Sequence, residues 1–167
     1  MNASMRGDAM KETAREFLGH RSFAVAGVSR KGGLPANLIY RRLRDAGYGV
    51  AAVNPATDRV EGDPCYARLT DVPGAIDVVV IATPPSAAAD LVRECAIVGV
   101  RRVWLHRSFG EGSVSPEAVE LARSYGMTVL DGGCPLMYIE PVDVAHRCMR
   151  WVLKRTGGLP DPAPLRG

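Results

Sequence analysis

A short β-branched run constrains the fold of this chain more than any other feature. Residues 78–81 read Val-Val-Val-Ile, with no polar residue alternating between the apolar ones. Such a strand is typical of a parallel sheet that helices cover on both faces. The Pro84-Pro85 pair follows directly and ends the run. We therefore expect a central, doubly buried strand at residues 77–82.

Strand-like and helix-like segments alternate along the rest of the chain. We expect further strands at residues 23–26, 48–53, 102–105 and 127–130, with a short one near Cys65-Tyr66. We expect helices at residues 8–18, 35–47, 87–98 (capped by Ser86), 115–126 and 141–156, several of which end at glycine. This alternation predicts an α/β fold with a doubly wound parallel sheet of Rossmann-like type.

The predicted domain organisation is a single folded unit with two terminal additions. A chain of 167 residues can bury one core without disulfides or metals. Residues 1–20 are expected to form a helix packed on the domain, residues 21–156 the domain itself, and residues 157–167, which are rich in Gly and Pro, a flexible tail.

Composition argues against several classes of partner. The net charge of +3 is dispersed, and aromatic residues make up only 6%, so we expect no nucleic acid. The longest apolar run is too short to span a bilayer, and the charged N-terminus lacks the apolar core of a signal peptide. Four cysteines without close pairs predict reduced thiols and no metal site. We expect a cytoplasmic protein and leave a homodimer open.

The loop after the first strand is the strongest ligand-binding candidate. It reads Gly27-Val28-Ser29-Arg30-Lys31 and leads into a helix. Backbone N–H groups at the start of a helix, together with basic side chains, suit phosphate. Ser29 stands where the dinucleotide fingerprint requires its second glycine. The alternative is a plain turn with solvated basic residues.

The end of the second strand bears on the class of nucleotide. Asn54-Pro55 replaces the acidic residue that binds the ribose of NAD. This favours a ligand such as NADP or coenzyme A, with Arg59 as a further phosphate partner, although Asn54 could simply form an Asx-turn. Thr83-Pro84 would place a stiff apolar turn beside the first loop.

Two other loops carry reactive side chains at the same end of the sheet. His106 in a glycine-rich loop could act as a general acid or base, although its spacing from Ser108 and Glu111 predicts no triad. Cys134 follows two glycines and could have a lowered pKa. A small buried packing group is the other interpretation of Cys134.

Taken together, these segments resemble the coenzyme A-binding domain found at the N-terminus of the succinyl-CoA synthetase α subunit and as stand-alone proteins. The similar segments are Gly27-Val28-Ser29, Gly47-Tyr48-x-Val50, Val53-Asn54-Pro55, Gly62 with Tyr66 and Leu69, Pro84, Trp104 and Cys134-Pro135. Two features depart from the family: no arginine lies near Leu34, and Trp104 is not followed by the usual Gln-x-Gly segment.

The resemblance implies a site for coenzyme A or an acyl-CoA. In the family, the first loop and the Val-Asn-Pro segment hold the nucleotide end, and the proline turn borders the pantetheine arm. The implied contacts are Gly27, Val28, Ser29, Arg30, Lys31, Asn37, Asn54, Pro55, Thr83 and Pro84. The catalytic phosphohistidine of the synthetase lies outside this domain, so the resemblance predicts a small-molecule binding module without catalytic residues.

Three other functions stay open at this point. The same site could serve an NAD(P)-dependent oxidoreductase or redox sensor, with His106 as proton donor. Cys134 could form a mixed disulfide with the thiol of the coenzyme. A purely structural or interaction role would need no nucleotide at all.

Overall fold

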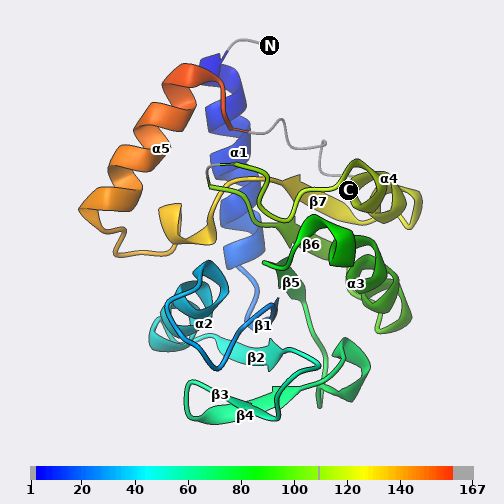
Figure 1. Ribbon diagram of the computed structural model, residues 1–167. Helices are drawn as coiled ribbons and strands as arrows, with labels where there is room; N and C mark the ends of the chain where they lie inside the picture. Colours follow the sequence, from blue (N-terminus) through cyan, green and yellow to red (C-terminus); the bar gives the residue numbers. More distant parts are fainter. Residues whose placement is uncertain (1–2, 109, 160–167) are drawn as a thin grey trace.

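The computed structural model describes residues 3–108 and 110–159 as one α/β unit built on a seven-stranded sheet (Figure 1). The strands are β1 (Ser22–Ala26), β2 (Gly49–Val53), β3 (Arg59–Val60), β4 (Asp63–Tyr66), β5 (Val78–Ile81), β6 (Arg102–Leu105) and β7 (Thr128–Asp131). The helices are α1 (Ala3–Leu18), α2 (Pro35–Asp45), α3 (Pro85–Ile97), α4 (Pro116–Ser124) and α5 (Val144–Thr156), with 3₁₀ turns η1 (Leu69–Asp71) and η2 (Pro135–Met137).

The strand order is β3-β4-β2-β1-β5-β6-β7, and all neighbours except the β3–β4 pair are parallel. The chain first builds outward from β1 to β2 and β4, then returns to place β5 on the other side of β1. The strand order therefore reverses between β1 and β5, and ligands of doubly wound sheets bind at such a switch point. The predicted fold class is confirmed.

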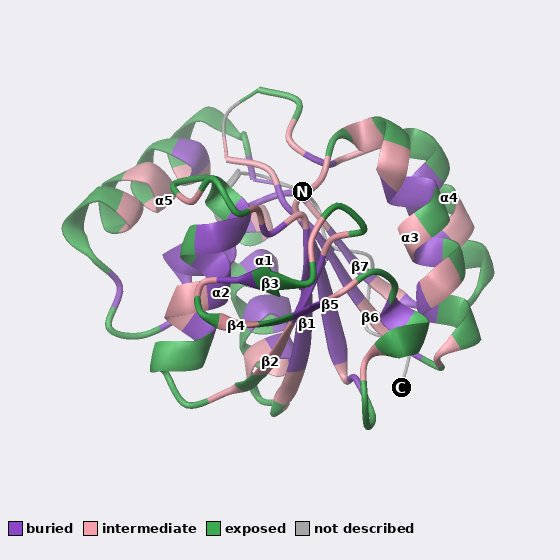
Figure 2. Cartoon of the chain, turned by 60° about the horizontal axis from the view of Figure 1, so that its bottom comes forward, coloured by how far each residue is buried: buried purple, intermediate pink, exposed green. Residues whose placement is uncertain are grey.

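The central strands are buried on both faces, as their apolar runs predict. Helices α1, α2 and α5 cover one face and α3 and α4 the other (Figure 2). Successive residues divide between the two cores: Val78 and Val80 pack toward the first layer, and Val79 and Ile81 toward the second. This explains why residues 78–81 lack a polar position.

Several boundaries differ from the sequence-based expectations. Helix α1 begins at Ala3 rather than at residue 8, and α5 begins after its cap Asp143 rather than at Pro141. Ser86 was expected to cap α3, but it lies inside the helix, and Pro84 occupies the cap position without a side-chain hydrogen bond. The antiparallel β3–β4 hairpin was not predicted, because β3 has only two residues and no alternating pattern.

Helix α1 packs mainly on α5 and β7, with Met10, Ala14 and Phe17 fully buried.

Of the expected tail, Leu159 is buried in the same core as α1 and α5, and residues 160–167 lie outside the described part. Among the described residues, no helix has the length and apolar character that crossing a membrane requires.

Candidate functional site

The turn between β1 and α2 lies directly against the end of β5. Gly27 has φ +103°, and a Cβ at this position would stand 2.5 Å from the carbonyl oxygen of Ala82. Its N–H donates to the carbonyl of Val53, 3.0 Å away at the end of β2. Only glycine permits this approach, which brings the ends of three neighbouring strands together.

Asn37 in the first turn of α2 holds this turn in place. Its side chain is fully buried. Its Oδ1 accepts from the N–H of Ser29 (3.1 Å), and its Nδ2 donates to the Ser29 carbonyl (2.7 Å) and to Glu61 Oε1 (2.6 Å). The bond from Asn37, with Arg41 beside it, holds the pKa of Glu61 below its ordinary value. The amide of Asn37 thus fixes the backbone of Ser29.

Asn54 connects the turn after β2 to the turn after β1. Its Nδ2 donates to the carbonyl of Val28 (2.8 Å), and its Oδ1 accepts from the N–H of Ala56 (2.9 Å). The second bond is the Asx-turn considered from the sequence. Both ends of the Asn54 amide are therefore engaged by backbone groups, and an asparagine offers no carboxylate to a ribose diol.

A cavity of about 670 Å³ opens between these turns at the β1–β5 switch point. Its lining residues are Ala26, Gly27, Ser29, Leu34, Val53, Asn54, Pro55, Ala67, Arg68, Ala82, Thr83, Pro84, Ala87, Asp90, Leu91 and Glu94. Six of the ten predicted contact residues are among them: Gly27, Ser29, Asn54, Pro55, Thr83 and Pro84. Most of the wall is apolar.

The other four predicted contacts do not line the cavity. Val28 is buried and gives its carbonyl to Asn54, and Asn37 is buried behind Ser29. Arg30 and Lys31 are exposed on the turn that borders the cavity. Whether any of the ten touches a ligand stays a prediction.

Helix α3 supplies cavity residues that sequence reasoning missed. Ala87, Asp90, Leu91 and Glu94 all line the cavity. They recur at the spacing of one helix face, which was the available signal once the helix was placed after Pro84. Glu94 receives a bond from Arg68 Nε (3.1 Å) and another from the N–H of Leu69 (2.9 Å), closing the rim on the β4 side.

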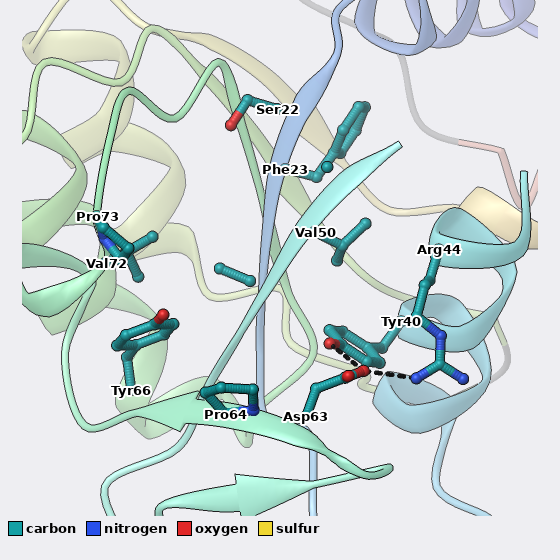
Figure 3. Close-up of a pocket in the computed structure, with 12 residues that line it drawn as sticks. Ser22, Phe23, Tyr40, Arg44, Val50, Asp63, Pro64, Tyr66, Val72 and Pro73 are labelled. Carbon is teal, nitrogen blue, oxygen red and sulfur yellow. Dashed lines mark hydrogen bonds and ion pairs between the residues drawn. The ribbon is translucent and has the colours of Figure 1, made fainter. Parts of the chain in front are cut away.

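A second cavity, of about 390 Å³, lies near the amino ends of β1 and β2 (Figure 3). Ser22 and Gly49, the first residues of these strands, contribute to its lining. Asp63 accepts hydrogen bonds from Tyr40 and from Arg44 at its side, so its polar groups satisfy one another. Burial, followed by the bond to Asp63, raises the pKa of Tyr40 to about 12.

The loops after β6 and β7 hold the other candidate residues. His106 is buried, and its Nε2 lies 3.2 Å from Ser108 Oγ. Burial lowers the pKa of His106 to about 4. Burial likewise raises the pKa of Cys134 to about 11, so of the two interpretations of Cys134 the small buried packing group is the one that the structure supports. In the described ranges, no group of three His, Cys, Asp or Glu side chains is arranged to hold a metal ion.

Known proteins resemble this chain across the same region. The ADP-forming acetate–CoA ligase I of Archaeoglobus fulgidus is 31% identical over 117 residues, which are 66% of this chain and 17% of the ligase. Protein YneT of Bacillus subtilis, described as uncharacterized, is 25% identical over 75% of this chain and 85% of its own length. A hypothetical protein from Pyrococcus horikoshii OT3 has a TM-score of 0.72 at 27% identity, covering 79% of this chain and 91% of that one.

This chain spans only 17% to 27% of the length of the acetate–CoA ligases that it matches. A family model described as "CoA binding domain" matches residues 21–140, from just before β1 to just after η2. That range contains the whole sheet and every residue that lines the 670 Å³ cavity. The chain therefore belongs to the CoA binding domain family.

Proposed function

We propose that this protein binds coenzyme A or an acyl-CoA in the cavity at the β1–β5 switch point. The observation that carries the proposal is that the turns after β1, β2 and β5 meet around one mainly apolar cavity of about 670 Å³. Family membership supports the same ligand, as do the curated relatives named as acetate–CoA ligases.

The turn after β1 suits the phosphates of such a ligand. Arg30 and Lys31 are exposed beside the cavity, and neither takes part in an ion pair within the described ranges. The first turn of α2 adds N–H groups that the helix itself does not use. Asn37 acts here as a positioning residue, since it fixes Ser29 from behind.

The walls of the cavity suit a ring or the pantetheine arm. Pro84, Ala87 and Leu91 form an apolar surface along the start of α3, and Leu34 contributes from the first turn. Ligand sites are commonly apolar with a few polar groups that fix orientation. The part of the ligand beyond the phosphates would gain its affinity by burial on this surface.

The oxidoreductase alternative has less support. It requires His106 as a proton donor, but burial lowers the pKa of His106 to about 4, which leaves the imidazole neutral at pH 7. Asn54 offers no carboxylate to a ribose diol. We therefore infer a binding module in which coenzyme A, not a nicotinamide cofactor, is the ligand.

Isothermal titration of the full chain with coenzyme A, acetyl-CoA, NADP and NAD tests the proposal. We expect saturable binding of one or both of the first two only. Ala87→Trp should weaken binding at least tenfold, about 1.4 kcal/mol, because the indole fills the cavity. Ala96→Trp is the matched control, since Ala96 lies exposed on the same helix and outside the cavity.

Two outcomes would contradict the proposal. Binding of NADP or NAD without binding of coenzyme A would favour the oxidoreductase. Equal affinity of the Ala87→Trp and Ala96→Trp variants for coenzyme A would place the ligand somewhere other than this cavity.

A further inference from the structure

Three polar side chains gather beyond the cavity, at the carboxyl ends of β6 and β7. His106 Nε2 lies 3.2 Å from Ser108 Oγ, and the Ser108 side chain, beside Cys134, partly offsets the raised pKa of the Cys134 thiol. A backbone bridge between Arg107 and Gly133 ties the two loops together. Neither the family model nor the names of the relatives assign a role to these three side chains.

His106 differs from the other two histidines of the chain. His20 and His146 are partly exposed and lie beside carboxylates, Glu16 at 3.2 Å and Asp143 at 2.6 Å. His106 is only 6% exposed and faces a hydroxyl instead. Ser108 is partly exposed and is therefore more accessible from solvent than the buried His106.

The cluster lies one strand away from the proposed coenzyme A site. The N–H of His106 donates to the carbonyl of Ile81 (2.9 Å), and the next residue, Ala82, begins the segment that lines the cavity. Neighbouring strands are about 4.8 Å apart. Gly27, Ala82 and His106 therefore follow three adjacent strands along one edge of the sheet.

We propose that Ser108 is a nucleophile that takes the acyl group from an acyl-CoA bound in the cavity, with His106 as its general base. This inference rests on the proposed function and extends it from binding to thioester cleavage. A serine activated by a neighbouring base is a common nucleophile for acyl transfer.

The reaction balances with water as the second substrate. Ser108 Oγ attacks the thioester carbonyl carbon while His106 Nε2 accepts the hydroxyl proton. The carbon–sulfur bond breaks, and the departing thiolate takes the proton from the imidazolium. Water then cleaves the ester on Ser108, so that the products are a carboxylic acid and coenzyme A.

Burial has two consequences for these groups. The pKa of His106, lowered to about 4, keeps the imidazole neutral with its lone pair available, but makes it a weak base. We therefore expect a slow reaction that single-turnover measurements detect. Burial raises the pKa of Cys134 to about 11, so this thiol stays protonated and does not attack the thioester.

The test incubates the full chain with acetyl-CoA and follows release of free thiol together with the intact mass of the protein. We expect thiol release in the wild type and in the exposed control Ser124→Ala, with one added acetyl group before water cleaves the ester. Ser108→Ala should show neither. His106→Gln should release thiol at least tenfold more slowly, and the wild-type rate should hold from pH 7 to about 5 and fall toward pH 4.

Titration of the same samples with coenzyme A separates the possible failures. Coenzyme A binding without thiol release would contradict the role of Ser108 as a nucleophile and would leave the proposed function unaffected. An acetyl adduct that persists in Ser108→Ala and disappears in Cys134→Ser would overturn that role in favour of the cysteine. Absence of any coenzyme A binding would overturn the proposed function and this inference with it.

Discussion

The two ends of the sheet use the same strands to form different cavities. At the carboxyl end, backbone and amide groups of Gly27, Asn37 and Asn54 hold the turns, and the enclosed space is mostly apolar. At the amino end, Tyr40, Asp63 and Arg44 bond to one another at the side of the cavity. At the carboxyl end, polar groups therefore hold the turns in place. At the amino end, they bond to one another beside the cavity.

This difference indicates which cavity is suited to a ligand. A ligand in the amino-end cavity would compete with bonds that Asp63 already receives, or leave its carboxylate desolvated. The carboxyl-end cavity offers apolar surface together with the exposed Arg30 and Lys31 nearby. Three pairs of variants, and a single variant at the amino end, test this contrast.

The largest expected effect is at Gly27, compared with Gly74 near the amino end. Both have positive φ, +103° and +83°, but only the Cβ of an alanine at 27 would meet another atom within 4 Å. We expect Gly27→Ala to cost about 4 kcal/mol of unfolding free energy or more, and Gly74→Ala about 1 kcal/mol from backbone strain alone. Urea denaturation measures both. Equal losses would mean that the turn does not depend on contact with Ala82.

The second comparison sets His106 against His20. His106 has a folded-state pKa of about 4 against an ordinary value of 6.5, so the unfolded chain binds its proton first as the pH falls. The stability contributed by the neutral imidazole is full above pH 6.5 and is lost between pH 6.5 and 4, up to about 3 kcal/mol. Denaturation of His106→Gln across this range should show a smaller acid dependence.

His20→Gln is the matched control, because His20 is partly exposed and lies beside Glu16 at the end of α1. It should keep the acid dependence of the wild type. A wild-type curve that is flat between pH 6.5 and 4 would show that the His106 imidazole is not buried in solution.

The third comparison concerns Asn37, which fixes Ser29 and reaches Glu61. Asn37→Ala should cost about 2–3 kcal/mol, because it leaves buried groups of the turn without partners. Coenzyme A affinity should fall as well, since Ser29 is then free to move. The exposed neighbour Leu38 provides a control, and Leu38→Ala should leave stability within about 0.5 kcal/mol of the wild type. Unchanged stability in Asn37→Ala would show that the Asn37 amide does not stabilise the turn at Ser29.

The structural role of Asn37 could not be predicted from the sequence, whereas the fold could. The fold followed from local patterns: the run at 78–81 required cover on both faces, and glycines such as Gly47 and Gly99 follow the ends of helices. The role of Asn37 depends on Glu61, 24 residues away, which comes within reach only through the β3–β4 hairpin. A pair set by tertiary packing leaves no periodic signal in the sequence.

The site, like the fold, could be predicted only where it depends on the order of the elements along the chain. Turns after strands converge at one edge of any parallel sheet, so Gly27, Asn54 and Pro84 could be grouped from order alone. Which face of α3 meets the cavity depends on how the helix packs, and Glu94 was therefore missed. The contact between Ser108 and His106 could not be predicted, because separation in sequence does not determine where two side chains point.

The smallest expected effect is at Tyr40, at the amino end. Tyr40→Phe keeps the buried ring and removes only the hydroxyl that donates to Asp63, 2.9 Å away. Because Asp63 is partly exposed and keeps Arg44, we expect a loss of about 1 kcal/mol in urea denaturation. The affinity for coenzyme A should stay at the wild-type value, since Tyr40 lines the amino-end cavity alone. Weaker coenzyme A binding by Tyr40→Phe, with stability unchanged, would place the ligand at the amino end and reverse the assignment of the two cavities.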